Sequence, residues 1–142
     1  MSLFSALQVS ASGMSAQRTR AETAVENMAN SETTRTPEGG PYRRKDVVFT
    51  TDLQSSPFSS VFQNELAEGV RVAEVAQDDQ APDMRYLPGH PDANADGYVA
   101  FPRMNPTEEM VNLMSASRSY QANVAAISSV KDMISRSISI MS

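Results

Sequence analysis

The residues of this chain whose types and spacing come closest to a binding site lie between Asp92 and Gly97. Asp92, Asn94 and Asp96 match the ligand positions one, three and five of a calcium-binding EF-hand loop, and Gly97 matches position six. Position twelve of that loop is a bidentate glutamate, but Arg103 occupies it here, and prolines replace the flanking helices. The sequence therefore favours a polar turn whose side chains accept hydrogen bonds from nearby backbone amides. A calcium-stabilised loop is the alternative.

Catalytic chemistry has few candidates in this sequence. His90 is the single histidine, and a general base would need a nucleophile and an orienting carboxylate brought to it. No serine has a Gly-x-Ser-x-Gly setting, and the absence of cysteine excludes thiol catalysis, cysteine zinc sites and disulfides. The run Glu38–Pro41 is too short to cradle a phosphate. We therefore expect that the chain is not an enzyme and binds no cofactor or metal.

Charge and hydropathy exclude two further classes of partner. The net charge is −5, whereas nucleic-acid binding needs a concentrated positive surface. The one basic cluster, Arg43-Arg44-Lys45, is short and fits a solvated strand face or a protein contact. No apolar run approaches the roughly 18 residues of a membrane-spanning helix, and the amino terminus lacks the pattern of a secretory signal. We expect no nucleic-acid partner, no direct membrane insertion and, if the chain leaves the cytoplasm, export without a cleaved signal peptide.

The strongest structural pattern is a carboxyl-terminal helix beginning at Asn105. Asn105 fits the N-cap and Pro106 the first helical position, while Glu108 is placed for a capping-box bond back to the cap. Neither glycine nor proline interrupts the next 35 residues, which predicts a helix of roughly 50–55 Å. A compact chain of this length would be only about 35–40 Å across. The helix should therefore project beyond any single-chain core.

One side of this helix shows an unbroken alternation of spacings of three and four, typical of a coiled-coil seam. The seam consists of Met110, Leu113, Ser117, Tyr120, Val124, Ile127, Lys131, Ile134, Ile138 and Met141. Its polar members, Ser117 and Lys131, fix register or oligomeric state in such seams, unless the seam turns toward solvent there. Arg118 lies off the seam, where it could pair with a carboxylate of an adjacent subunit. Tyr120 is expected to be a core aromatic.

Residues 3–29 show the same spacing in a weaker form. The positions are Leu7, Ala11, Met14, Arg18, Ala21, Val25 and Met28. Arg18 falls on a core position, and Gly13 costs up to about 1 kcal/mol relative to alanine in a helix. Such a helix is marginal alone, so we expect it to be ordered by packing on the carboxyl-terminal helix or on a neighbouring chain.

The middle of the chain has the character of loops and short strands. Residues 30–41 are rich in Ser, Thr, Pro and Gly and form a linker, and residues 55–63 form a loop anchored by Phe58 and Phe62. Strands are predicted over residues 42–51, 69–75 and 98–101, with a bulge near Val75 and extended loop over most of 77–102. The predicted fold is mainly α: residues 1–30 and 105–142 form one antiparallel, coiled-coil-like hairpin, and residues 31–104 form a small irregular β-containing insertion.

Both ends of the chain also resemble one protein family. The run from Asn105 to Asn123 resembles the carboxyl-terminal signature of bacterial flagellar rod and hook axial proteins, and residues 12–17 and 28–33 resemble the matching amino-terminal signature. The internal motifs at residues 39–45 and 88–99 are similar to those of a rod member of this family. Family members often carry paired asparagines where this chain has Glu26-Asn27, a departure that bears on a local cap or inter-subunit contact.

The resemblance implies a structural subunit of the flagellar basal-body proximal rod, which polymerises through its terminal helices into a tubular drive shaft between motor and hook. It implies export by the flagellar type III apparatus without signal cleavage, assembly in the periplasm, and contacts with copies of itself and other rod proteins. Helices of family members are commonly disordered in the free subunit. The alternative function is a small helical-hairpin binding module with a calcium-stabilised loop at Asp92–Gly97.

Overall fold

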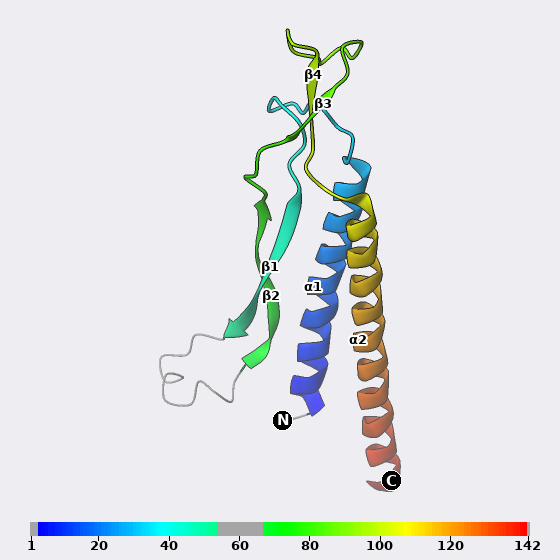
Figure 1. Ribbon diagram of the computed structural model, residues 1–142. Coiled ribbons are helices and arrows are strands. Elements are labelled where there is room, and N and C mark those ends of the chain that lie inside the picture. The colour runs from blue at the N-terminus through cyan, green and yellow to red at the C-terminus, as the bar shows by residue number, and fades with distance from the viewer. Residues whose placement is uncertain (1–2, 54–66, 142) are drawn as a thin grey trace.

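The computed structural model describes residues 3–53 and 67–141, and the predicted loop anchors Phe58 and Phe62 lie outside these ranges. The elements are α1 (Leu3–Ala29), β1 (Lys45–Leu53), β2 (Ala67–Gln77), β3 (Asp83–Tyr86), β4 (Tyr98–Phe101) and α2 (Pro106–Met141). Figure 1 shows α1 and α2 side by side and antiparallel, the β1–β2 hairpin along α1, and β3–β4 at the end of the molecule away from both termini. The predicted helical hairpin with a small β-containing insertion is confirmed.

The start of α2 follows the predicted cap. The side chain of Asn105 accepts a hydrogen bond from the Thr107 amide (3.0 Å), and the Asn105 carbonyl accepts one from the Glu108 amide (3.0 Å). The reciprocal capping-box bond from the Glu108 carboxylate to the Asn105 amide is not among the hydrogen bonds of the described residues. Glu108 instead lies exposed beside a groove, so the cap depends on the asparagine.

Small and polar residues join α1 to α2. At Gly13, an added Cβ would lie 2.9 Å from Nδ2 of Asn123, so the helices approach closely there. One heptad further along α1, the Arg20 guanidinium donates to the Asn112 side chain at 3.3 Å. The buried apolar side chains of the two helices are mostly alanines, namely Ala16, Ala24 and Ala116, with Val130. The helices therefore pair by close approach rather than by interlocking large side chains.

This close pairing decides where the predicted seam residues lie. On α2, Leu113, Ile127 and Ile134 are half-buried, whereas Met110, Ser117, Tyr120, Val124, Lys131 and Ile138 are exposed. On α1, Leu7, Met14, Ala21 and Met28 are half-buried, whereas Ala11, Arg18 and Val25 are exposed. The buried positions of α2, at Glu109, Ala116 and Val130, fall one residue before the exposed row that contains Met110, Ser117, Val124 and Lys131. Half of the seam thus remains uncovered within the subunit, and its role between subunits stays a prediction.

The β1–β2 hairpin is antiparallel and packs on α1. Val48 pairs with Glu74 and Phe49 with Val72, which leaves Ala73 as the extra residue of a bulge, two residues before the predicted position. Near the start of β2, the Val70 amide donates a hydrogen bond to the Ser12 hydroxyl of α1 at 3.1 Å. The hairpin is therefore attached to α1 through its backbone as well as through side chains.

Gly69, next to this attachment, gives a first prediction. Its φ is +141°, and an added Cβ would lie 2.3 Å from the Ser12 hydroxyl oxygen. We expect Gly69→Ala to lower the free energy of unfolding by about 2–3 kcal/mol, from backbone strain together with loss of the Ser12 bond. Gly40→Ala is the matched control, because Gly40 also has positive φ (+78°) but has nothing within 4 Å of the added carbon. Urea unfolding that shows equal losses for both variants would contradict the steric part of the argument.

The β3–β4 hairpin corrects one expectation. Residues 98–101 form β4 as predicted, but residues 83–86, assigned to extended loop, form its partner β3. All four residues of β3 are exposed, and the alternation of Asp83, Met84, Arg85 and Tyr86 is too short to distinguish a strand from a loop. The predicted polar turn is present between the strands, because the Asn94 side-chain oxygen accepts hydrogen bonds from the Asp96 amide (3.0 Å) and the Tyr98 amide (2.8 Å). In the described ranges, neither helix has the length and apolarity needed to cross a membrane.

Candidate functional site: a buried polar junction

A cluster of polar side chains joins the helical hairpin to the β insertion. It consists of Asn27 near the end of α1, Tyr42 and Arg44 from the segment before β1, Lys45 at the start of β1, and Glu109 in the first turn of α2. We call this group the junction cluster. These residues lie at the same level of the molecule, because the end of α1 lies beside the start of the antiparallel α2 (Figure 1).

Asn27 is the centre of the junction cluster and is 1% exposed. Its side-chain oxygen accepts hydrogen bonds from the Lys45 amide (2.9 Å) and the Tyr42 hydroxyl (3.0 Å). Its side-chain nitrogen donates to the Lys45 carbonyl (2.8 Å) and to a carboxylate oxygen of Glu109 (3.1 Å). All four hydrogen-bonding positions of the amide are used, so this one side chain ties both helices to the first strand.

Glu109 supplies the charge at the junction cluster. The residue is 2% exposed, and its other carboxylate oxygen accepts a hydrogen bond from Nε of Arg44 at 2.7 Å. Burial acts to lower the pKa of the Arg44 guanidinium, but the hydrogen bond and charge of Glu109, with help from Asp46, outweigh burial and raise that pKa above its ordinary value. The Arg44 guanidinium therefore remains charged in the folded chain, with the Glu109 side chain at the positive end of α2 as its partner.

Tyr42 gives the junction cluster a measurable pH dependence. Burial, with the carboxylates of Glu26 and Glu109, raises the pKa of its phenol to about 12, against about 10 for an unperturbed tyrosine. Because the folded-state pKa lies above the unfolded one, the stabilisation from Tyr42 is fully present below about pH 10 and is lost as the pH rises toward 12. We expect Tyr42→Phe to be less stable than the parent chain at pH 8, and this gap to close between about pH 10 and 12.

Urea midpoints measured across this pH range, for the parent chain and for Tyr42→Phe, test the expectation. Tyr98→Phe is the control, since Tyr98 is exposed and begins β4, which lies at the far end of the molecule (Figure 1). A gap between parent and Tyr42→Phe that stays constant to pH 12 would show that the phenol is not buried beside these carboxylates.

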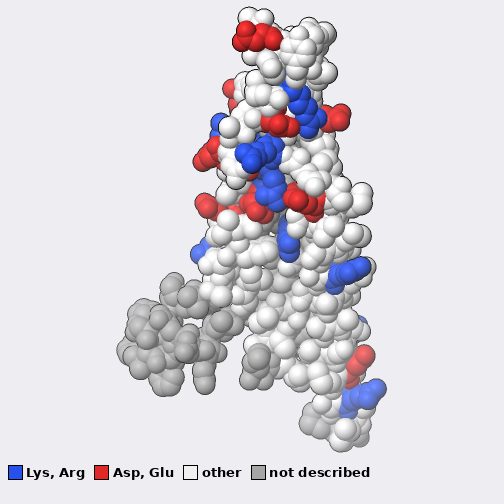
Figure 2. Space-filling view, in the orientation of Figure 1, with Lys and Arg blue, Asp and Glu red and all other residues white. Residues whose placement is uncertain are grey.

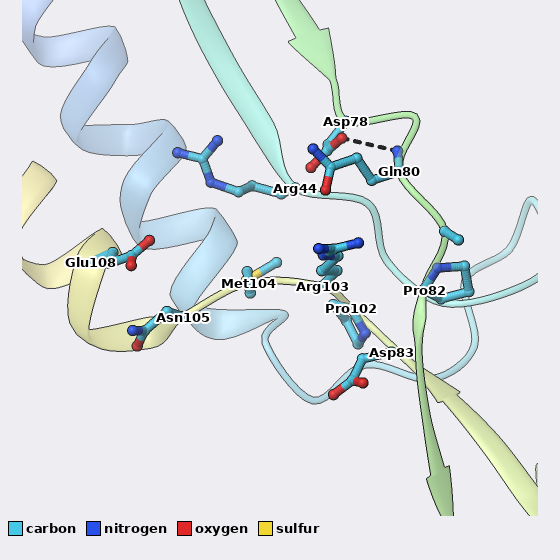
Figure 3. Close-up of a pocket in the computed structure, with 11 residues that line it drawn as sticks. Arg44, Asp78, Gln80, Pro82, Asp83, Pro102, Arg103, Met104, Asn105 and Glu108 are labelled. Atoms are coloured by element: carbon cyan, nitrogen blue, oxygen red, sulfur yellow. Dashed lines mark hydrogen bonds between the residues drawn. The ribbon is translucent and has the colours of Figure 1, made fainter.

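A polar groove of about 650 Å³ lies next to the junction cluster, between the β2–β3 connection and the start of α2 (Figure 3). Its walls include Pro82, Pro102, Arg103 and Glu108. The Arg44 side chain extends from the groove toward the helices, where it meets Glu109 (Figure 3). Among the residues that line the groove, no nucleophile is paired with a base.

The candidate calcium ligands do not point to a common centre. Asp92 accepts a hydrogen bond from the Thr34 hydroxyl at 2.8 Å and lies 3.8 Å from Arg35, whereas Asn94 is engaged by the two turn amides. His90 accepts a hydrogen bond from the Asp92 amide through Nδ1 at 3.1 Å. In the part of the chain that the structure describes, no three His, Cys, Asp or Glu residues gather as a metal site. These side chains order the loop and anchor it to the linker after α1.

The chain is similar to known flagellar proteins over almost its whole length. A family model described as the flagellar basal body rod FlgEFG protein C-terminal matches residues 95–140. The flagellar basal-body rod protein FlgC of Bacillus subtilis is 40% identical over 99% of both chains, and that of Borreliella burgdorferi is 39% identical over 99% of both chains. FlgC of Salmonella typhimurium is 38% identical over 99% of this chain and 98% of its own.

The chain belongs to the FlgC family of flagellar basal-body rod proteins. In this FlgC-family chain the terminal signatures meet inside the subunit. Ser12 and Gly13 contact β2 and α2, and Asn27 of the divergent Glu26-Asn27 pair holds the junction cluster. The departure noted in the sequence therefore leaves the central asparagine in place. Glu26 pairs with the Lys45 ammonium group.

Sequence reasoning missed the junction cluster of this FlgC-family chain. It predicted no partner for Glu109 and assigned the basic cluster Arg43-Arg44-Lys45 to a solvated strand face or a protein contact. One signal was available: Gly13, Arg20 and Asn27 recur at heptad spacing, and the structure places all three against α2. A heptad row of small and polar residues is therefore a sequence signal for close helix pairing, just as a heptad row of apolar residues is.

Proposed function

We propose that this chain is a subunit of the flagellar proximal rod and polymerises through its terminal helices into the tubular drive shaft that passes torque from motor to hook. The observation that supports this most is the uncovered apolar surface of the helical hairpin. Large apolar side chains remain exposed along both helices, including Val9, Val25, Met110, Val111, Met114, Val124 and Ile138. Small residues close the hairpin internally, so these larger side chains are available for neighbouring subunits.

The charge distribution supports the same proposal. From Leu3 to Gln17, α1 contains no charged residue, and α2 contains only Arg118 between Met110 and Val130. Figure 2 shows the corresponding half of the molecule as largely uncharged, below a belt rich in both signs. A long surface without charges can pack against identical surfaces without burying unpaired ions. Contacts between different surface patches of successive copies then generate a helical tube rather than a closed ring.

The assembly contacts we propose are the seam residues of both helices: Leu7, Met14, Ala21, Val25, Met28, Met110, Leu113, Tyr120, Val124, Ile127, Ile134, Ile138 and Met141. Ser117 and Lys131 would set the register between neighbours, and Arg118 would meet a neighbouring carboxylate. The partners are copies of this chain and other flagellar rod proteins. The chain reaches the periplasmic basal body through the flagellar type III export apparatus, without a cleaved signal peptide, and has no catalytic function, cofactor, nucleic-acid partner or direct membrane insertion in this proposal.

Torque transfer requires stiffness along the helices and a firm attachment of the insertion. α2 has 36 residues, which corresponds to a length of about 54 Å at 1.5 Å per residue. The junction cluster fixes the insertion to both helices through fully paired polar groups, which hold geometry more strictly than apolar contacts do. In the proposed rod, the insertion would lock neighbouring subunits laterally while the helices pack in the inner tube.

The test is a charged substitution at an exposed seam position. Val124 is 45% exposed, so Val124→Glu is expected to leave the unfolding free energy of the purified chain within about 0.5 kcal/mol of the parent. Buried between subunits, the same carboxylate would lack a partner, and we expect at least a tenfold loss of basal bodies with complete rods in cells that carry only this variant. Val124→Leu, which keeps the surface apolar, is the control. Normal rod numbers and swimming with Val124→Glu would refute the proposed role of this surface.

A further inference from the structure

One end of the molecule exposes a compact apolar patch on the β3–β4 hairpin. The patch consists of Met84, Tyr86, Leu87 and Tyr98, and we call it the tip patch. Tyr86 is 64% exposed although its ring packs edge to face on that of Tyr98, with 5.3 Å between the ring centres. The hairpin lies beyond the ends of both helices (Figure 1), so nothing in the described part of the subunit covers this patch.

The tip patch is held in a fixed shape in spite of its exposure. Gly97 has φ of +81°, and an added Cβ there would lie 2.9 Å from the ring of Tyr86, so the turn supports the ring directly. On the other side of the hairpin, the Arg85 guanidinium lies over the ring of Phe101 at 4.6 Å from its centre. Two exposed aromatic rings supported in this way form a pre-organised binding surface, because little side-chain freedom is left to lose.

The opposite end of the molecule exposes a second apolar element. Gly13 lies opposite Asn123, and ten residues further along each antiparallel helix Leu3 comes level with about Met133. Residues 134–141 of α2 therefore extend past the start of α1, as Figure 1 shows. This tail segment, about 12 Å long at 1.5 Å per residue, exposes Ile138 and Ile140, the latter to 85%.

The two ends have opposite charge. Residues 83–101 contain Asp83, Asp92 and Asp96 against Arg85, a net charge of −2 with His90 neutral, because one positive charge is subtracted from three negative ones. Residues 131–141 contain Lys131 and Arg136 against Asp132, a net charge of +1. Figure 2 shows acidic side chains at the upper end, where the tip patch lies. Two apolar surfaces with complementary charge suit each other as partners.

We infer that the tip patch of one copy is the docking surface for the tail segment of α2 of a second copy, in a head-to-tail contact. This inference rests on the proposed function, since it concerns how copies of the chain contact each other in the rod. The two surfaces differ and lie at opposite ends of an elongated subunit. Their contact is heterologous and does not close on itself, so it adds axial growth to the lateral packing of the helices.

Disulfide trapping tests this contact cleanly because the chain has no cysteine of its own. The double variant Tyr86→Cys with Ile140→Cys is expressed as the sole copy in cells, and isolated basal bodies are oxidised and separated without reductant. We expect dimers and longer multimers of the chain that disappear on reduction and in either single variant. The control pair is Val48→Cys with Ile140→Cys, because Val48 is also exposed (43%) but lies on β1, which runs alongside α1 and not at the tip (Figure 1). We expect at least tenfold less cross-linked product from the control pair.

Two results would overturn the inference while leaving the proposed function intact. The first is a double variant that is present in basal bodies but remains monomeric after oxidation. The second is a control pair that cross-links equally well. By contrast, absence of the parent chain from isolated basal bodies would refute the proposed function itself.

A charge exchange covers the case in which the cysteine pair prevents assembly. Asp96→Arg and Arg136→Asp are each expected to reduce the number of complete rods several-fold through like-charge contact, and the double variant is expected to restore it. If the double variant reduces the number of complete rods by the product of the two single-variant factors, the two ends do not meet and the inference is wrong.

Discussion

Glu109→Ala is expected to lower the free energy of unfolding by about 2–4 kcal/mol, the largest loss from any single carboxylate described above. The substitution leaves Nε of Arg44 and one donor of Asn27 without an acceptor in a region where Glu109 itself is 2% exposed, although Arg44 keeps its ion pair with Asp46 at 3.3 Å. Because Arg44 is only part-buried, water relieves some of the cost, and the value stays below that of a fully enclosed charge pair. Urea unfolding of the purified chain, followed by circular dichroism, measures the change.

Glu108→Ala is the matched control, one residue earlier in the same helical turn. Glu108 is exposed, and its removal is expected to change the unfolding free energy by less than about 0.5 kcal/mol. Glu109→Gln separates charge from hydrogen bonding, because it keeps the side-chain shape and one acceptor. We expect it to recover about half of the loss. If Glu109→Ala is no worse than Glu108→Ala, the junction cluster does not hold the insertion to the helices.

Asn27→Ala is expected to cost about 3 kcal/mol, because it removes four hydrogen bonds and leaves the amide and carbonyl of Lys45 without partners in a buried site. The effect should extend beyond stability. With Asn27 gone, the backbone of β1 is no longer bonded to α1 at Lys45, so hydrogen exchange of the Lys45 amide should accelerate at least tenfold more than that of amides in the middle of α2.

Asn27→Asp distinguishes a hydrogen-bonding role from simple filling of space. The variant keeps the volume and the oxygen that accepts from Tyr42 and Lys45, but it replaces the donor nitrogen by a second carboxylate oxygen 3.1 Å from that of Glu109. Like charges at this distance raise the pKa of a carboxyl group, so the variant should regain stability relative to the parent as the pH falls.

Asn30→Ala, which loses a local bond to the Glu26 carbonyl, should cost only about 1 kcal/mol. Equal losses for Asn27→Ala and Asn30→Ala would contradict the central place of Asn27.

The helical part of the fold could be predicted because its signals are local and repeated. Asn105 and Pro106 mark the start of α2 as the structure has it, and the unbroken spacing of apolar residues predicts both helices. The polar turn around Asn94 follows from the turn chemistry of asparagine. The strand at residues 98–101 and the bulge in β2 follow from the positions of β-branched and aromatic residues.

The faces of the helices could not be assigned from the same spacing. Large apolar residues at Met110 and Val124 dominate any periodicity, so the neighbouring row at Glu109 and Ala116 is overlooked, although the structure buries it. Close pairing through small residues leaves the large ones outside, the reverse of a single-chain core. In the proposed rod these large residues would pack between subunits, so their spacing misleads an assignment made for one subunit.

The junction cluster and β3 were missed for different physical reasons. The partners of Asn27 come from residues 15 to 82 positions away, and no local pattern announces such contacts. The strand β3 is fully exposed, and it forms because Asp83–Tyr86 pairs with β4 across the connection of residues 87–97 rather than because of its own propensity. Long-range pairing decides both features.

The most direct test of the central claim, that the exposed seam of the hairpin is buried between subunits in the rod, is thiol labelling at Val124. A single Val124→Cys variant, in a chain with no other cysteine, is treated with a maleimide reagent as purified chain and in isolated basal bodies. Labelling after dissolving the basal bodies in denaturant shows that the thiol is intact. We predict rapid labelling of the purified chain, where Val124 is 45% exposed, and at least tenfold slower labelling in the basal body. Equal rates in the two states would contradict the account.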